Sequence, residues 1–214
     1  MKTTILLIRH GQSEGNLAGV FTGHSGYSLT PLGYQQAART AECIRKKYSV
    51  SAVYSSDLPR AFQTAEQIAK AFALTVVTDF RLREIFAGDW ENVAFDDLCV
   101  RYPTAYEVWR KNLGYARCTN GEAVLEVAQR MGDTIRELVS IYEGQTIVIV
   151  SHATPIRATL WKASGKDIDV LQEQSWGSNC AISELVCENG VLSIGYSNYT
   201  DHLAGVETSL PTNI

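Results

Sequence analysis

Short apolar runs alternate along the chain with longer segments in which apolar residues recur at helical spacing. The short runs are typical of strands buried on both faces of a parallel sheet, and they cover residues 5–8, 52–54, 74–77 and 146–150. Helical spacing extends over residues 31–48, 58–72, 122–142 and 155–163. Strands that alternate with helices predict an α/β fold, built as a three-layer αβα sandwich around a mostly parallel central sheet.

Capping and turn residues indicate where some of these elements begin and end. Thr30 is expected to cap the first long helix, with Pro31 in its first turn. Near the C-terminus, Asn189-Gly190 is a strong hairpin signal. The strands predicted on its two sides cover residues 181–187 and 191–196. Because the two strands of a hairpin are antiparallel, we expect an antiparallel edge strand beside the parallel part of the sheet.

Residues 86–120 carry mixed signals. Aromatic residues recur there at roughly helical spacing, but Pro103 and Gly114 interrupt the pattern. We interpret the segment as an irregular, partly helical insertion. Most of its aromatic residues are expected to pack as a small core, although Trp109, together with Phe21, is also suited to line a pocket.

The composition excludes several classes of protein. Apolar residues make up 45% and charged residues 20% of the 214 residues, which is unlike a disordered chain. The longest apolar run is too short to span a membrane. The net charge of −4 argues against a sequence-independent nucleic-acid binder, which would carry a basic excess. We therefore expect one domain over residues 1–214, with neither a membrane nor a nucleic acid as its partner.

The cysteines indicate a reducing environment. There are five of them, an odd number, and no two form a Cys-x-x-Cys pair. This pattern predicts neither a disulfide framework nor a zinc site. The N-terminal apolar run of four residues is too short for a secretory signal peptide. Together these features predict a cytoplasmic location.

Basic side chains cluster just past the ends of three predicted strands: Arg9, His10, Arg60 and His152. In open α/β sheets, ligands bind beyond the carboxyl ends of the strands. Two guanidiniums and two imidazoles at that edge would form a compact cationic pocket, and the paired hydrogen bonds of arginine suit a phosphate group.

The backbone next to this cluster is also suited to an anion. Gly11 leaves the main chain open to a ligand, and a helix that begins after it would direct its N-terminus at the anion. No group of carboxylates suited to Mg²⁺ accompanies the basic residues. We therefore expect a phosphate site that uses neither a metal nor another cofactor.

These residues are part of a longer series of motifs that resembles the histidine phosphatase superfamily, the group that includes phosphoglycerate mutase. The motifs occur in the family's order over most of the chain. They are Leu7-Ile8-Arg9-His10-Gly11, Phe21-Thr22-Gly23, Leu29-Thr30-Pro31-Leu32-Gly33, then Ser55, Asp57, Arg60 and Ala61, then Leu82-Arg83-Glu84-Ile85, Gly88, Trp90 and Val150-Ser151-His152. The resemblance implies that the insertion at about 86–120 lies over the active site.

The resemblance also implies roles for five core residues. His10 corresponds to the nucleophile that becomes phosphohistidine, and for that it must be neutral. Arg9, Arg60 and His152 correspond to the rest of the phosphate pocket, which stabilises charge on the transferring group. Glu84 corresponds to the acid/base residue, which protonates the departing alcohol and then takes a proton from the attacking water.

Other positions resemble secondary contacts to the substrate in this family: Asn16, Thr22, Gly23 and Ala153. Ser13 resembles such a contact too, but it is equally suited to cap a helix or form a turn. The partner implied is a small-molecule phosphate ester.

Three functions remain open on this basis. We favour a metal-independent phosphomonoesterase, of the compact phosphatase type. A cofactor-dependent phosphoglycerate mutase would have a longer insertion with a tyrosine close behind the acid, whereas Ile85-Phe86-Ala87 follows Glu84. A non-catalytic phosphate-binding module would be expected to lack one of the five core residues. The sequence leaves open whether the protein is a monomer or a homodimer.

Overall fold

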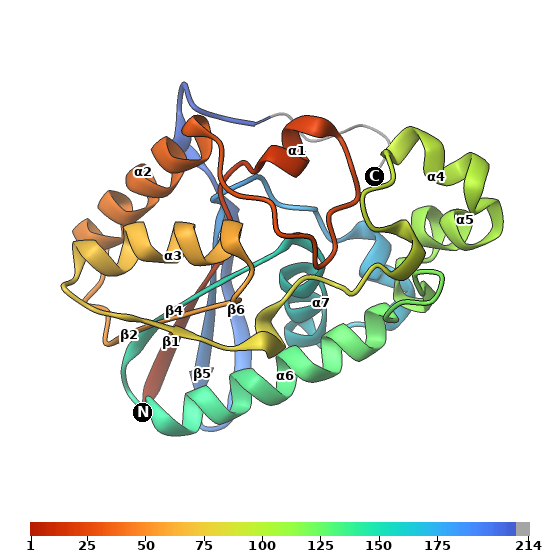
Figure 1. Ribbon diagram of the computed structural model, residues 1–214. Helices are drawn as coiled ribbons and strands as arrows, with labels where there is room; N and C mark the ends of the chain where they lie inside the picture. The colour runs from red at the N-terminus through yellow and green to blue at the C-terminus, as the bar shows by residue number, and fades with distance from the viewer. Residues whose placement is uncertain (209–214) are drawn as a thin grey trace.

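The computed structural model describes residues 1–208, and a six-stranded sheet lies at its centre (Figure 1). The strands are β1 (Lys2–Arg9), β2 (Ala52–Ser55), β3 (Val76–Thr78), β4 (Thr146–Ser151), β5 (Ile182–Glu188) and β6 (Val191–Tyr199). In the order β3-β2-β4-β1-β5-β6, the first four strands are parallel, and β5 is antiparallel to both of its neighbours. The mostly parallel sheet and its antiparallel edge, formed by the hairpin of β5 and β6, are confirmed.

Helices cover both faces of this sheet. They are α1 (Glu14–Ala18), α2 (Pro31–Lys47), α3 (Pro59–Ala71), α4 (Phe95–Arg101), α5 (Pro103–Lys111), α6 (Val124–Ile141) and α7 (Ala153–Ser164). Because side chains alternate along β1, Leu6 and Ile8 pack into one apolar cluster with α2 and α3. Ile5 and Leu7 pack into a second cluster with α6 and α7. Figure 1 shows the two helix pairs on opposite sides of the strands, which confirms the three-layer sandwich.

Short 3₁₀ turns connect several of these elements. They are η1 (Phe80–Leu82), η2 (Gly88–Trp90), η3 (Leu113–Tyr115), η4 (Ile168–Glu173) and η5 (Asp201–Leu203). The first of them follows β3 and leads into the motif around Glu84.

The element boundaries lie close to the predicted ones, and the differences have local causes. α7 begins two residues earlier than predicted, because His152 is its N-cap. β3 begins at Val76, because the Leu74 amide still donates to a carbonyl in the last turn of α3. The hairpin turn has φ angles of 52° at Asn189 and 79° at Gly190, the left-handed pair that such a two-residue turn requires.

The insertion at 86–120 is partly helical and packs its aromatic residues inward. Trp90 is fully buried, and Tyr106 and Trp109 are almost as deeply buried. Phe21 meets the rings of Trp90 and Trp109 edge-on, with centroids 5.5 and 5.2 Å apart. These contacts attach the insertion to the loop that follows α1, beside the carboxyl ends of the parallel strands.

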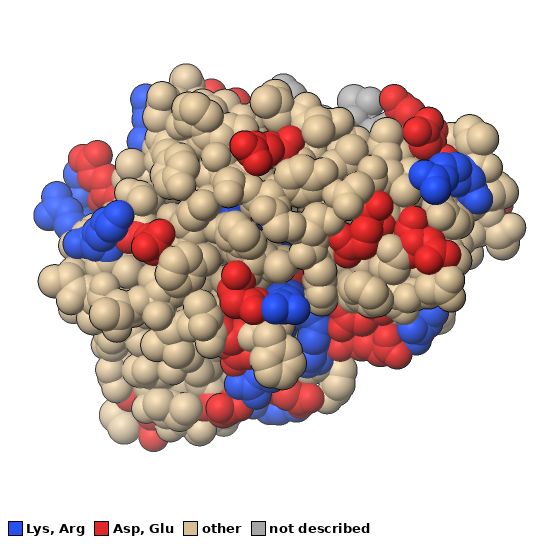
Figure 2. Space-filling view, in the orientation of Figure 1, with Lys and Arg blue, Asp and Glu red and all other residues tan. Residues whose placement is uncertain are grey.

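The surface carries charges of both signs. On the face shown in Figure 2, basic and acidic side chains are interspersed, with no broad basic area that would attract a polyanion. All five cysteines are free thiols, and three of them, Cys118, Cys180 and Cys187, are buried. Within residues 1–208, no helix has both the length and the apolar character needed to cross a membrane.

Two glycines allow the loop after β1 to lie directly against the start of α2. A Cβ atom on Gly33 would lie 2.1 Å from the carbonyl oxygen of Gln12, and one on Gly11 would lie 2.6 Å from the carbonyl oxygen of Gly33. The Gly11 amide also donates to Thr64 Oγ1 at 3.0 Å. The backbone beside His10 is therefore held between α2 and α3, with no room for a side chain.

We expect Gly33→Ala to lower the free energy of unfolding by about 1–3 kcal/mol, because the new methyl group meets backbone atoms that cannot rotate away. Gly26→Ala is the matched control, because a methyl group there would have no neighbour within 4 Å and the φ of Gly26 is not left-handed. Urea unfolding of both variants measures the difference. Equal stability of the two variants would contradict this account of the close approach.

Candidate active site

The parallel strands bring the predicted basic residues to one edge of the sheet. Arg9 at the end of β1 pairs in register with Ser151 at the end of β4, and His10 and His152 follow directly. Their imidazole rings have centroids 5.1 Å apart. Arg60, the second residue of α3, reaches this pair from the neighbouring strand–helix connection. The structure thus brings His10 together with Arg60, 50 residues away in the sequence, and with His152, more than 140 residues away.

The hydrogen bonds of His10 define which ring nitrogen carries the proton. Nδ1 lies 2.7 Å from the carbonyl oxygen of Gly11, and because a carbonyl only accepts, Nδ1 donates. Nε2 accepts a hydrogen bond from Nε of Arg60 at 3.3 Å. Burial, with the charges of Arg60 and Arg9, holds the pKa of His10 well below its usual value. The imidazole is therefore neutral, and the lone pair on its Nε2 accepts the hydrogen bond from Arg60.

His152 is fully buried beside it. Its Nε2 lies 2.9 Å from Oγ of Ser56, and that hydroxyl oxygen accepts from the Leu58 amide. A Ser56 hydroxyl that donates to Nε2 leaves the proton on Nδ1, which has no hydrogen-bond partner in residues 1–208. Burial and the neighbouring Arg60 and His10 also hold the pKa of His152 well below its usual value. His152 therefore offers a buried N–H donor.

The two arginines supply the positive charge. Arg9 donates from Nη1 to the carbonyl oxygen of Gly177 at 2.7 Å, while its buried Nε has no partner in the described part of the chain. Arg60 donates to the carbonyl oxygens of Ser25 and Gly23 at 2.9 and 2.8 Å. Burial lowers the pKa of both guanidiniums to about 10, so both remain protonated at neutral pH. Two cations held largely by neutral carbonyls leave an excess of positive charge for an anion.

A cavity opens beside His10 and contains the predicted acid/base residue. Glu84 lines this cavity, with only 8% of its surface exposed. The Glu84 carboxylate accepts a hydrogen bond from the Ile85 amide at 2.9 Å. Four aromatic residues also line it: Phe21, Phe95, Trp109 and Trp176. The cavity therefore combines a cation and hydrogen-bonding groups with apolar rings. Among residues 1–208, no group of three or more His, Cys, Asp or Glu side chains is arranged to hold a metal ion.

The predicted secondary contacts divide into two groups. Asn16, Thr22, Gly23 and Ala153 line the cavity. Ser13 does not: it is buried, and its hydroxyl caps α1 by accepting from the Asn16 amide. Of the two roles considered for Ser13, the structure therefore shows the cap.

The helix N-terminus at the cavity belongs to α7 rather than to the helix expected after Gly11. α1 has five residues, and its first turn is already satisfied by the Ser13 cap. Ala153 and Thr154, the first two residues of the twelve-residue α7, line the cavity instead. Their position places the positive end of a longer helix dipole beside the cavity.

Two residues that support the site have no signal in the sequence pattern. Asn179, in the loop before β5, donates to the carbonyl oxygen of His10 at 3.0 Å and to Asn16 Oδ1 at 3.1 Å. His24 is half-buried and donates from Nε2 to the carbonyl oxygen of Glu84 at 2.9 Å. Both contact backbone atoms, and no spacing or motif predicts such a contact. For His24, the adjacent Gly23 is the only hint.

The chain is similar to known proteins over most of its length. The family model of the histidine phosphatase superfamily (branch 1) matches residues 5–200. "Probable phosphoglycerate mutase GpmB" of Proteus mirabilis is 33% identical, over 86% of this chain and 85% of that protein. "Phosphoserine phosphatase 1" of Hydrogenobacter thermophilus is 29% identical, over 82% of this chain and 81% of that protein.

Solved structures and longer relatives extend the comparison. The structure of Bacillus stearothermophilus YhfR has a TM-score of 0.89 and 25% identity, covering 94% of this chain and 99% of that one. Mycobacterial relatives, among them "Bifunctional protein Rv2228c" of Mycobacterium tuberculosis, are 31% identical over 94% of this chain. The chain spans about half the length, 55%, of these mycobacterial relatives.

We expect the two buried histidines to make the protein less stable as the pH falls below 6.5, the pKa of an ordinary histidine. Between that value and their much lower folded-state pKa values, the unfolded chain binds more protons, so protons favour unfolding. Each histidine then lowers the free energy of unfolding by up to about 1.4 kcal/mol for every unit by which the pH falls. Urea unfolding between pH 7 and pH 5 measures this slope.

His10→Asn should reduce the slope of the free energy of unfolding against pH by the contribution of one histidine, up to about 1.4 kcal/mol per pH unit. The matched control is Asn16→Ala, which removes a non-titrating side chain from the same cavity and should keep the original slope. If His10→Asn leaves the slope unchanged, His10 does not have the low pKa derived from its surroundings.

Proposed function

Because the chain belongs to the histidine phosphatase superfamily (branch 1), we propose that it is a phosphomonoesterase that hydrolyses small organic phosphates through a phosphohistidine on His10. One observation carries this proposal. The His10 imidazole is neutral, and its Nε2 lone pair faces the guanidinium of Arg60 among excess positive charge. A neutral nitrogen nucleophile inside a cationic, donor-rich pocket is the combination that attack on a phosphate dianion requires.

In the first half-reaction, the hydrogen bond from Arg60 to Nε2 of His10 is released. Nε2 then forms a bond to phosphorus as the bond from phosphorus to the ester oxygen breaks. Arg9, Arg60 and the Nδ1–H of His152 stabilise the charge on the three equatorial oxygens of the transferring phosphoryl group. Glu84, in its protonated form, gives its proton to the leaving oxygen, which departs as a neutral alcohol.

In the second half-reaction, Glu84 is a carboxylate and accepts a proton from a water molecule. The water oxygen bonds to phosphorus, and the bond from phosphorus to Nε2 breaks. Inorganic phosphate leaves, His10 is again neutral and Glu84 is again protonated. The cycle balances as one ester and one water giving one alcohol and one phosphate, with no further reactant.

The lining of the cavity favours hydrolysis over a mutase reaction. A mutase must retain a phosphorylated sugar acid, whose carboxylate needs cationic partners of its own. Here aromatic rings line the cavity, among them Phe95, Trp109 and Trp176, and Arg9 is the single Lys or Arg in the lining within residues 1–208. We therefore retain the phosphatase, although relatives named for both reactions are similar to this chain.

The substrate class is a small phosphate ester whose alcohol fits a half-apolar cavity. A sugar phosphate, a phosphoglycerate and α-ribazole phosphate are the candidates that the family resemblance suggests. The name of the Hydrogenobacter relative adds phosphoserine to them. The free thiols support a reducing compartment, for which we propose the cytoplasm.

We expect the wild-type protein to hydrolyse p-nitrophenyl phosphate in the presence of a chelator, and His10→Ala to lower kcat/KM by at least about 10⁴-fold, because the nucleophile is lost. His202→Ala, which removes an imidazole packed on Tyr199 outside the cavity lining, should keep wild-type activity. Loss of wild-type activity on chelation would contradict the metal-independent mechanism. Rapid interconversion of 3- and 2-phosphoglycerate with little phosphate release would contradict the choice of a phosphatase.

Glu84→Gln should slow hydrolysis most for esters with poor leaving groups. An alkyl alcohol needs a proton as it departs, so its kcat/KM should fall by about 10²- to 10⁴-fold. Dinitrophenolate is stable without a proton, so kcat/KM for 2,4-dinitrophenyl phosphate should change little. Rates over a series of esters measure this dependence, and equal losses across the series would show that Glu84 is not the proton donor.

A further inference from the structure

The backbone around Glu84 is held by side chains rather than by regular secondary structure. From residue 81 to residue 84, every carbonyl oxygen accepts a hydrogen bond from a side chain. Arg130 on α6 donates from Nη1 to Arg81 and Arg83 at 2.6 and 2.7 Å, and from Nη2 to Glu84 at 2.9 Å. Ser151 donates to the carbonyl oxygen of Leu82 at 2.7 Å.

Arg130 uses all five of its N–H groups in this arrangement. The remaining two bond to Glu122, from Nε to Oε1 at 2.7 Å and from Nη2 to Oε2 at 3.0 Å. Glu122 also forms two hydrogen bonds with Phe86, beyond Glu84 in the chain. Its Oε2 accepts from the Phe86 amide at 3.0 Å, and its backbone amide donates to the Phe86 carbonyl oxygen at 2.8 Å. We call this arrangement the Arg130–Glu122 brace.

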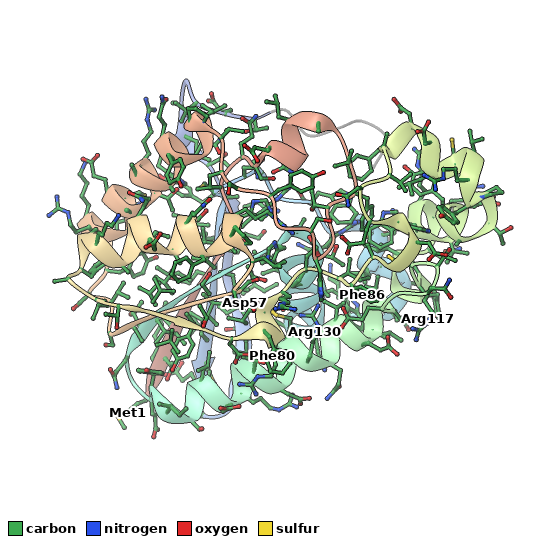
Figure 3. All side chains as sticks on the ribbon, in the orientation of Figure 1. Met1, Asp57, Phe80, Phe86, Arg117 and Arg130 are labelled. Atoms are coloured by element: carbon green, nitrogen blue, oxygen red, sulfur yellow. The ribbon has the colours of Figure 1, made fainter. Side chains whose placement is uncertain are left out.

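The brace lies between a rigid helix and the loop that carries Glu84. α6 has eighteen residues and a fully buried face that includes Val127 and Met131, so Arg130 projects from a fixed base. About four-fifths of the Arg130 and Glu122 side chains are shielded from solvent. Figure 3 shows Arg130 where α6 meets the segment bearing Phe80 and Phe86.

The carboxylate of Glu84 follows the backbone that the brace holds. Its Oε1 accepts from the amide of the very next residue, Ile85. The direction of the side chain is therefore fixed by the main chain at residues 84–85 rather than by a distant side chain. A small displacement of that main chain would move the carboxyl group relative to His10, and proton transfer is sensitive to displacements of about 1 Å.

We propose that Arg130, paired with Glu122, is a positioning residue for the acid/base step. It acts through Glu84, by holding residues 81–86 so that the carboxyl group meets the leaving-group oxygen, and it does not itself touch the substrate. The inference rests on the proposed phosphatase reaction. A planar five-donor guanidinium is required, because the three-donor ammonium of lysine cannot bridge three carbonyls and a carboxylate.

The test is Arg130→Gln, assayed with a series of phosphate esters. We expect kcat/KM to fall about 10²-fold for an alkyl phosphate, because general acid catalysis contributes at least that much. For 2,4-dinitrophenyl phosphate the change should be within about threefold, since its leaving group needs no proton. Arg136→Gln is the matched control, because Arg136 lies on the same helix with 59% of its side chain exposed, paired with Asp133. It should change neither rate.

A double-mutant cycle separates positioning from a merely structural role. If Arg130 acts through Glu84, Arg130→Gln should have little further effect on the alkyl ester in a Glu84→Gln background. Losses that multiply in the double variant would overturn the proposal, and so would an Arg130→Gln loss that is equal for all esters. If Arg130→Gln does not fold, Glu122→Gln carries the same test, because it weakens the two-pronged pairing while retaining an acceptor.

The experiment also separates this inference from the function on which it rests. His10-dependent hydrolysis by the wild-type protein with leaving-group-independent losses in Arg130→Gln overturns the brace alone. Absence of any His10-dependent hydrolysis by the wild-type protein overturns the phosphatase, and with it the role of Arg130. A selective loss for alkyl esters that disappears in the Glu84→Gln background supports both.

Discussion

In the proposed reaction, His10 must be uncharged to attack phosphorus, although the positive charges that attract the phosphate surround it. Burial and the Arg60 guanidinium together meet both requirements. Burial is the larger cause of the lowered pKa of His10, and the Nε–H of Arg60, which points at Nε2, further disfavours a second proton on the ring. The Gly11 carbonyl fixes the remaining proton on Nδ1. The local fold positions this pair. His10 follows β1, and Arg60 lies in the first turn of α3. The backbone next to His10 packs closely against α2, because Gly11 and Gly33 have no side chains.

This arrangement carries a cost in stability. Arg9 and Arg60 are buried with carbonyl oxygens as their hydrogen-bond acceptors, and one nitrogen of Arg9 and one of His152 have no partner in residues 1–208. Unpaired buried donors are unfavourable in a free protein but become favourable contacts when an anion supplies the missing acceptors. Local conflicts of this kind are expected where a fold serves binding rather than its own stability. The same carbonyls also tie two loops to the cations: Gly23 and Ser25 lie in the loop between α1 and α2, and Gly177 lies in the loop before β5.

Sequence patterns predict the parts of this design that depend on periodicity. The alternation of strands and helices predicts the layers, and the rule that ligands bind beyond strand ends gathers Arg9, His10, Arg60 and His152. Glu84 lies outside any such pattern, and only the family resemblance singles it out. Asn179, His24 and Arg130 could not be predicted, because they bond to backbone carbonyls in irregular segments. Such contacts depend on where two loops meet in space, and no spacing along the chain encodes that.

The three parts of the proposed site are therefore held by different parts of the fold. The phosphate side rests on strand ends and on the first turns of α3 and α7, so the geometry of the central sheet fixes it. The segment with the proposed acid, Glu84, is held to α6 by hydrogen bonds from the Arg130 side chain to backbone carbonyls. The proposed leaving-group side is formed by the insertion and by Trp176, whose ring is stacked on that of Trp109 with centroids 5.9 Å apart. These parts still share supports, because the insertion packs against α6 and Trp176 stacks on Arg157 of α7. A substitution among the aromatic residues would leave the strand register that places His10 and His152 unchanged, because that register is set by β1 and β4 alone.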